Sequence, residues 1–281
     1  MPKVIEIGLS PCPNDTFIFD ALINKKIETG SLHFNPNLQD VETLNEWALK
    51  KKLPVTKLSY GVLPFVLKDY AVLQSGSALG SGVGPLLLKI KSDEILNVDE
   101  KLIALPGENT TAHLLFSLAY PYAKNKTFLR YNEIENFVLD GKGLGVIIHE
   151  NRFTYQDKGL EQVKDLGNFW EKQTGSPIPL GGIVVDRFMP AELQMQIDAL
   201  IKKSIEYAFK NYPLLAPFVK ENSQEMNEEV MRKHIELYVN EHSLALGVQG
   251  RAAVEKLLSV FHKMNKSTAQ AKTIFVKEER Y

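Results

Sequence analysis

Apolar residues recur with two different spacings along the first part of the chain. Three short β-rich runs predict strands over Val4 to Ser10, Ser31 to Asn35 and Pro54 to Ser59. The segments between them, Asp15 to Lys25 and Asp40 to Lys51, carry apolar residues at helical spacing. This β-α-β-α-β order predicts an α/β unit with a mostly parallel sheet.

A second alternating set follows a strand predicted over Leu86 to Ile90 and a charged connection over Lys91 to Lys101. Its expected strands and helices are Leu102 to Leu105, Thr110 to Ala119, Phe128 to Tyr131, Glu133 to Leu139 and Leu144 to His149. A further strand is predicted over Gly182 to Val185. The pattern therefore indicates a second α/β unit after the first.

The chain is almost wholly helical in character from Pro190 to Asn265. Glu192 to Tyr212, Asn227 to His242 and Gly250 to Met264 each keep the helical period. If these helices pack back onto the first unit, the chain crosses twice between two lobes. We predict a two-lobed α/β fold with a central cleft. We expect residues 1–92 and 200–281 in the larger lobe, and residues 93–199 in the smaller.

Composition narrows the class of protein. The 281 residues are 44% hydrophobic and 24% charged, with a formal net charge of −1, which is ordinary for a globular protein. The near-zero charge argues against a general nucleic-acid binder. No apolar run has the length of a membrane span, and the first residues do not form a signal peptide. We therefore expect a cytoplasmic protein with neither a membrane nor a nucleic-acid partner.

The sequence offers little sign of a metal or cofactor. The one cysteine, Cys12, excludes an intrachain disulfide, and we take it also to exclude a cysteine-based zinc site. No histidine or carboxylate spacing is typical of metal ligands. The glycine-rich run from Gly76 to Gly84 lacks both nucleotide-binding patterns and precedes a strand, so we interpret it as a loop. We predict no metal and no cofactor.

Small polar residues gather where predicted strands end, which is where ligands bind in open parallel sheets. Four segments lie at strand ends in this way: Ser10 to Thr16, Lys57 to Gly61, Pro106 to Thr111, and His149 to Arg152. The first contains Ser10 and Asn14, and the second contains Ser59 together with the apolar Leu58. If the lobes face one another, these segments line one cleft. A small polar molecule is therefore the expected partner.

Two of these segments contain residues with both a functional and a structural interpretation. Thr110 and Thr111 stand at a predicted helix start, where free backbone N–H groups make an anion site, or where one residue only caps the helix. His149 ends an apolar strand and is either a general base or a partly buried structural histidine. The remaining histidines are expected to be structural or on the surface.

Six ordered blocks resemble the 1,4-dihydroxy-6-naphthoate synthases of menaquinone biosynthesis by the futalosine route. They are SPCPNDTFIF from Ser10, TKLSYG from Thr56, GSALGSGVGP from Gly76, LPGENTTAHLL from Leu105, IIHENRFTY from Ile147 and PIPLGGIVV from Pro177. The likeness covers the chain to about residue 187 and extends more loosely through the helical segment. Ser81 is a departure, because a basic residue is expected there in many relatives.

The resemblance implies a fold like that of type 2 periplasmic binding proteins. It implies a cofactor-free lyase that converts cyclic dehypoxanthine futalosine, a carboxylate, into 1,4-dihydroxy-6-naphthoate. The family's catalytic base matches His149, and its substrate-binding stretches match Lys57, Leu58 and Ser59, and Thr111 with Ala112. The strand-end argument adds Ser10, Asn14 and Thr110 as candidate binding residues.

Two alternatives stay open at this point. Chorismate dehydratase acts earlier in the same pathway on a similar fold. A non-catalytic solute-binding protein also needs a cleft with small polar residues, but we expect such a protein to be exported. A homodimer is possible.

Overall fold

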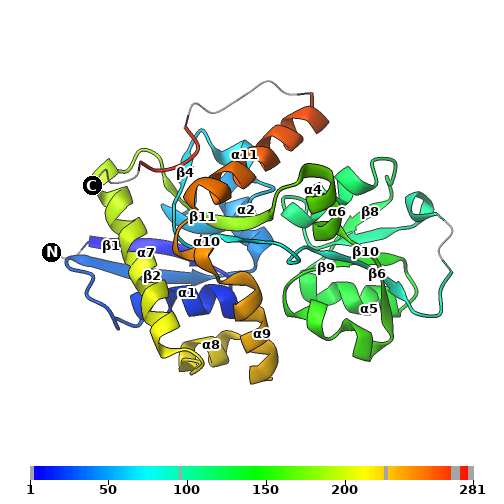
Figure 1. Ribbon diagram of the computed structural model, residues 1–281, viewed down its shortest axis with the longest axis horizontal. Coiled ribbons are helices and arrows are strands. Elements are labelled where there is room, and N and C mark those ends of the chain that lie inside the picture. Colours follow the sequence, from blue (N-terminus) through cyan, green and yellow to red (C-terminus); the bar gives the residue numbers. More distant parts are fainter. Residues whose placement is uncertain (1–2, 95–96, 225–226, 267–272, 278–281) are drawn as a thin grey trace.

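The computed structural model describes residues 3–94, 97–224, 227–266 and 273–277, and shows two lobes, each built on its own sheet (Figure 1). The first sheet has the order β2-β1-β3-β11-β4, with β5 also paired to β11. Its strands are β1 (Lys3–Leu9), β2 (Leu32–Leu38), β3 (Val55–Ser59), β4 (Tyr70–Val72), β5 (Ala78–Gly80) and β11 (Ile178–Asp186). The two-lobed α/β architecture predicted from the sequence is confirmed.

The second sheet has the order β10-β6-β9-β7-β8. Its strands are β6 (Leu86–Ile90), β7 (Ile103–Leu105), β8 (Lys126–Phe128), β9 (Leu144–Ile147) and β10 (Leu160–Asp165). Helices α4 (Thr111–Ala119) and α6 (Leu166–Thr174) contribute to one core beside this sheet, and α5 (Ile134–Leu139) contributes to another. The sheet is therefore covered on both faces, as the buried central strands require.

Helices cover both faces of the first sheet as well. One core joins strand residues such as Ile7 to α1 (Pro13–Ile23), α7 (Ala191–Asn211), α8 (Pro217–Asn222) and α9 (Glu228–Tyr238). The opposite face packs against α2 (Val41–Leu49), α3 (Leu63–Val66) and α11 (Gly247–Met264). The short α10 (Glu241–Leu244) contacts α7 and β5. The C-terminal helices thus return to the first lobe, as Figure 1 shows.

The sheets are less parallel than the sequence predicts. Strand β1 is parallel to β2 and β3, and β7 is parallel to β8 and β9. Strand β11 is antiparallel to its three partners, and β6 is antiparallel to β9 and β10. These antiparallel strands are the ones that enter each lobe from the other, so the crossovers change the strand direction.

Sheet membership differs from the predicted lobe boundaries at residues 92 and 199. Strand β6 lies before residue 92 but pairs within the second sheet. Strand β11 lies before residue 199 but pairs within the first sheet. By this criterion the chain changes lobe between Gly80 and Leu86, and again between Thr174 and Ile178.

Some predicted elements shift and others were missed. The strand expected over Phe128 to Tyr131 instead covers Lys126–Phe128, and Tyr131 begins a 3₁₀ turn. Residues 149–153, which follow β9, form the 3₁₀ helix η3 (His149–Phe153). The sequence analysis did not predict β4, β5, β10, α3, α6 or α8 as separate elements. Strands β4 and β5 are only three residues long, and β10 is largely polar (LEQVKD). None of the three strands therefore shows a clear alternation of apolar and polar residues.

The end of the described chain adds to the edge of the first sheet. Phe275 bridges Val72 in a parallel arrangement, and the Val276 N–H donates to the Val72 carbonyl at 2.9 Å.

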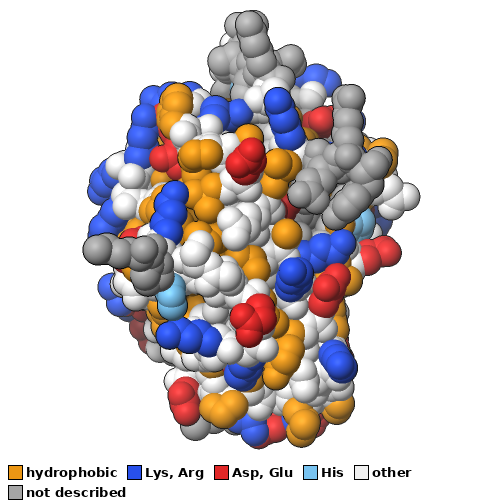
Figure 2. Space-filling view, turned by 90° about the vertical axis from the view of Figure 1, so that its left-hand side faces the viewer, with side chains coloured by type: hydrophobic (Ala, Val, Ile, Leu, Met, Phe, Trp, Pro, Cys, Tyr) orange, Lys and Arg blue, Asp and Glu red, His pale blue; other side chains and the backbone are white. Residues whose placement is uncertain are grey.

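No helix of the described residues is long and apolar enough to cross a membrane. On the face of the first lobe drawn in Figure 2, basic and acidic side chains are interspersed, in keeping with the balanced charge.

Candidate functional site

A pocket lies between the two lobes, and its void is about 670 Å³ when counted out to its open mouth. The structure brings all nine candidate residues from the sequence to its wall: Ser10, Asn14, Lys57, Leu58, Ser59, Thr110, Thr111, Ala112 and His149. Apolar side chains, among them Val41, Val83 and Leu180, complete the lining. The geometry on which the sequence argument depends, one pocket shared by both lobes, is therefore present.

Strand ends and helix starts position the polar groups. Ser10 follows β1, Ser59 ends β3, and Thr110 is the N-cap of α4. The Thr110 hydroxyl donates to the Gly107 carbonyl and accepts from the His113 N–H, while the Thr111 hydroxyl donates to the Leu180 carbonyl at 2.6 Å. Because both hydroxyls bond within the protein itself, the backbone N–H groups at the α4 start are the candidate donors to a ligand in this segment.

A buried ion pair forms the floor of the first-lobe side. Lys57 Nζ lies 2.8 Å from Asp15 Oδ1, and both side chains are almost fully buried. The other oxygen of Asp15 accepts from the backbone N–H and the hydroxyl of Ser10. Asn14 Nδ2 donates to Asp15 Oδ1 at 3.0 Å. Asp15 therefore links the loop after β1, the start of α1 and strand β3.

The His149 imidazole enters the pocket from the second lobe. Its backbone has a φ of 60°, the left-handed region that is uncommon outside glycine, and its ring packs edge-on to Tyr131 at 4.8 Å. Burial lowers the pKa of His149 to about 4, and the Asp15 carboxylate acts in the opposite direction. The imidazole is therefore neutral at neutral pH and carries a lone pair that can accept a proton.

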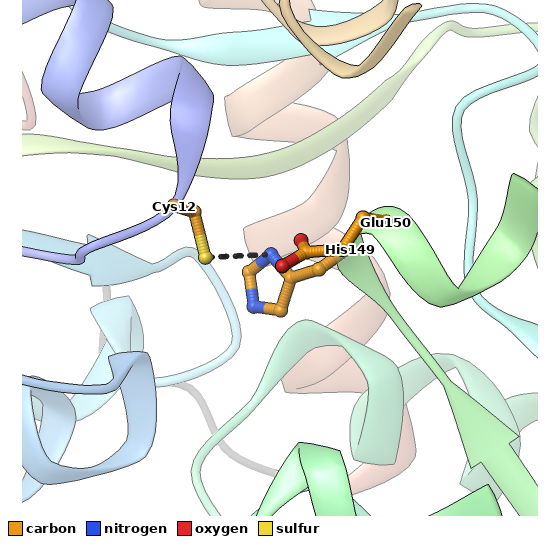
Figure 3. A group of neighbouring side chains, drawn as sticks. All are labelled: Cys12, His149 and Glu150. Carbon is orange, nitrogen blue, oxygen red and sulfur yellow. Dashed lines mark hydrogen bonds between the residues drawn. The ribbon is translucent and has the colours of Figure 1, made fainter. Parts of the chain in front are cut away.

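Cys12 approaches His149 across the cleft from the N-cap of α1. Its sulfur lies 3.5 Å from His149 Nδ1, which leaves Nε2 outside this contact (Figure 3). Burial and the nearby Glu150 carboxylate raise the pKa of the Cys12 thiol well above its usual value. Cys12 is therefore a neutral thiol at neutral pH.

His234 is a pocket residue that the sequence interpretation assigned to the structural or surface class. It is fully buried on α9, stacks on His149 with ring centroids 6.1 Å apart, and its Nε2 lies 2.9 Å from Asn14 Oδ1. Burial, then the neighbouring His149, lowers its pKa well below the usual value. Its only signal in the sequence was the apolar period of α9, which predicts burial without identifying a pocket.

Hydrogen bonds from α2 hold the lobes together beside the pocket. Glu42 accepts from the backbone N–H of Asn109 at 3.0 Å and from its side-chain amide at 2.7 Å. Burial raises the pKa of Glu42, and the hydrogen bonds from Asn109 act in the opposite direction. Asn45 is fully buried and bonds both to Ser59 and to the Asn109 carbonyl. These contacts connect the β3 end to the α4 start.

Gly61 of the first lobe lies directly against the backbone at the start of α4 in the second lobe, and replacing it by alanine is expected to separate the lobes. A Cβ at Gly61 would lie 2.6 Å from the carbonyl atoms of Thr110 and 2.7 Å from the Thr111 nitrogen. Overpacking against a backbone costs about 1–3 kcal/mol. We expect Gly61→Ala to lower the free energy of unfolding by this amount in urea titrations and to weaken ligand binding.

The matched control is Gly80→Ala. A Cβ at Gly80 would meet nothing closer than 3.4 Å, and its backbone is not in the left-handed region. Equal stability and equal ligand affinity of the two variants would contradict the assigned lobe contact.

A group of possible metal ligands lies in the same pocket region. Cys12, His149 and Glu150 each offer an atom, and these atoms lie within 4.8 Å of one another (Figure 3). The expectation of no metal overlooked this set, because Cys12 is 137 residues away from His149 in the sequence. Spacing along the chain carries no sign of such an arrangement.

Comparison with known proteins gives the family. Residues 5–263 match the family described as menaquinone biosynthesis. A relative from Thermus thermophilus, called 1,4-dihydroxy-6-naphthoate synthase, is 39% identical over 275 residues, which are 98% of this chain and 100% of its own. A relative of the same name from Streptomyces coelicolor is 40% identical over 261 residues, 91% of this chain and 92% of its own.

Solved structures agree on the fold. A protein from Archaeoglobus fulgidus, AF1704, superposes with a TM-score of 0.88 at 30% identity, covering 94% of this chain and 98% of its own. The periplasmic aliphatic sulphonate-binding protein of Escherichia coli superposes with a TM-score of 0.64 at 11% identity, covering 100% and 96%. The second likeness concerns the fold alone and confirms the periplasmic-binding-protein-like architecture.

The named relatives are enzymes of menaquinone biosynthesis, and the expectation that this chain is one is confirmed. The match over most of its length shows that the chain belongs to the menaquinone-biosynthesis family, together with the 1,4-dihydroxy-6-naphthoate synthases.

Proposed function

We propose that the protein is a carbon–carbon lyase that converts cyclic dehypoxanthine futalosine into 1,4-dihydroxy-6-naphthoate, with His149 as general base. The observation that carries the proposal is a neutral imidazole facing polar groups of both lobes in one pocket. The names of the two relatives supply the product, 1,4-dihydroxy-6-naphthoate. The expected cytoplasmic location is part of the proposal.

The pocket suits an aromatic carboxylate that carries a hydroxyl-rich sugar remnant. The backbone N–H groups of Thr111 and Ala112, at the positive end of α4, hold the carboxylate. Lys57 and Ser59 lie on the facing wall and bind the hydroxyl groups. Val41 and Leu180 cover the ring. The pocket therefore orients the substrate through contacts with both lobes.

His149 starts the chemistry in this proposal. The lone pair on Nε2 takes a proton from the sugar-derived part of the substrate, and the electron pair left behind drives cleavage of a carbon–carbon bond. Aromatisation of the second ring then supplies the thermodynamic drive, and the sugar-derived fragment leaves. General-base action of this kind contributes about 10²–10⁴-fold to the rate. Closure of the lobes excludes water from the intermediate.

Separate incubations identify the substrate. Purified protein with cyclic dehypoxanthine futalosine is expected to produce 1,4-dihydroxy-6-naphthoate in a mass spectrum, while chorismate is expected to be recovered unchanged. Boiled protein is the control for spontaneous conversion. Dehydration of chorismate with no naphthoate from the futalosine derivative would assign the chain to chorismate dehydratase instead.

The predictions about partners other than the substrate do not depend on this pocket. A small-molecule carboxylate as substrate belongs to the proposal. A homodimer, and the expected lack of nucleic-acid and membrane partners, stay predictions from the sequence.

A further inference from the structure

A sulfur, a nitrogen and an oxygen atom, each able to bind a metal ion, converge at the junction of the lobes. Cys12 Sγ comes from the start of α1, whereas His149 Nδ1 and a carboxylate oxygen of Glu150 come from η3 (Figure 3). Cys12 Sγ lies 3.5 Å from His149 Nδ1. Zinc binds sulfur at about 2.3 Å and nitrogen at about 2.0 Å, so two such ligands on a tetrahedral ion lie about 3.5 Å apart. The pair already has the spacing that a zinc ion needs.

A buried nitrogen beside this set supports the same interpretation. The ring of His234 is fully buried, and its Nε2 donates to Asn14 Oδ1, because the amide of Asn14 donates to Asp15 from its other end. The other ring nitrogen, Nδ1, has no hydrogen-bond partner among the described residues and lies 3.7 Å from Glu150 Oε2. A buried polar atom without a partner is costly, and a cation held beside Glu150 would give this nitrogen a partner.

The donor chemistry selects the ion. A thiolate and an imidazole favour zinc and related transition metals, whereas magnesium and calcium prefer sites made of oxygen atoms. We propose that Cys12, His149 and Glu150 bind a Zn²⁺ ion, with His234 facing the site. The Cys12 thiol releases its proton to solvent when the ion binds, and no oxidation or reduction takes place.

Zinc in this position switches the proposed enzyme off. Coordination through Nδ1 leaves the ring proton on Nε2, so the imidazole loses the lone pair that accepts the substrate proton. The ion also bridges the lobes, because Cys12 belongs to the first and His149 to the second. Zinc is therefore expected to inhibit turnover reversibly, with recovery after addition of a chelator. This inhibitory consequence rests on the proposed function, whereas metal binding itself does not.

Cobalt gives a direct readout, since a cobalt–thiolate bond absorbs in the near ultraviolet. Chelator-treated protein titrated with Co²⁺ is expected to develop this band, and Zn²⁺ is expected to remove it by displacement. Cys12 is the only cysteine of the chain, so the band reports this residue alone. Cys12→Ser is expected to abolish the band. Glu150→Gln is expected to weaken cobalt binding by at least about 10–100-fold, the loss seen even for outer partners of metal ligands.

A histidine far from the pocket provides the control. His33 lies on β2 and does not line the pocket, so His33→Asn is expected to bind cobalt like the wild type. No thiolate band in the wild-type protein, or equal cobalt affinity in Glu150→Gln, would overturn the metal site. Zinc binding, together with no naphthoate formation by the chelator-treated protein, would support the site and overturn the proposed function. Naphthoate formation without a cobalt band would do the reverse.

Discussion

Replacement of His149 by asparagine is expected to lower kcat for naphthoate formation by roughly 10²–10⁴-fold while the protein stays folded. The side chain removed is the neutral imidazole that points into the pocket. Asparagine is the suitable substitute because it tolerates the left-handed backbone better than most residues, and His149 has a φ of 60°. The loss is therefore expected in catalysis, with the KM changed far less.

The control for this experiment is the same substitution at His33, which lies outside the pocket. Circular dichroism and thermal melting of both variants check the fold. A folded His149→Asn protein with wild-type turnover would remove the general-base mechanism, even if the substrate assignment were right.

The second large effect is expected on stability. Replacing Lys57 by methionine leaves the Asp15 carboxylate buried without its cation, and we expect the free energy of unfolding to fall by about 3–5 kcal/mol. Methionine keeps the unbranched shape of the lysine stem, so the packing of β3 changes little. Urea unfolding monitored by tryptophan fluorescence measures the difference.

A double variant tests the electrostatic cause. In Lys57→Met with Asp15→Asn no charge is left buried, and the amide oxygen at position 15 can still accept from Ser10. Part of the lost stability is therefore expected to return. If the double variant is no more stable than Lys57→Met alone, the loss comes from packing and not from the unpaired carboxylate.

The sequence could predict the pocket lining because strand ends follow local rules. Ser10, Ser59 and Thr111 each stand just after a run whose period shows a strand or just inside a helix start, and parallel strands bring such ends together. His149 was found in the same way. The fold class followed from the alternation of periods, which needs no knowledge of contacts between distant residues.

The missed features depend on contacts between distant segments. His234 reaches Asn14 across 220 residues, and Cys12 reaches His149 across 137. Both pairs exist only because α9 packs against α1 and against η3, and no local pattern encodes this arrangement. The threonine hydroxyls show the same limit, since their partners Gly107 and Leu180 become visible only in the folded chain.

The strand near Phe128 shows how propensity misleads at an edge. Aromatic residues favour strands, so the run from Phe128 to Tyr131 predicted one. The observed strand β8 ends at Phe128, because β7, the one strand it pairs with among the described residues, is three residues long. Partner length therefore set the boundary, and this property is not local.

The most direct test of the central claim counts product molecules per protein chain. Protein at a small fraction of the concentration of cyclic dehypoxanthine futalosine is followed by mass spectrometry until the signal is constant. The account predicts many molecules of 1,4-dihydroxy-6-naphthoate for each chain. Tight binding of the compound in equal amount to the protein, with none of it converted, would contradict the account and indicate a solute-binding protein.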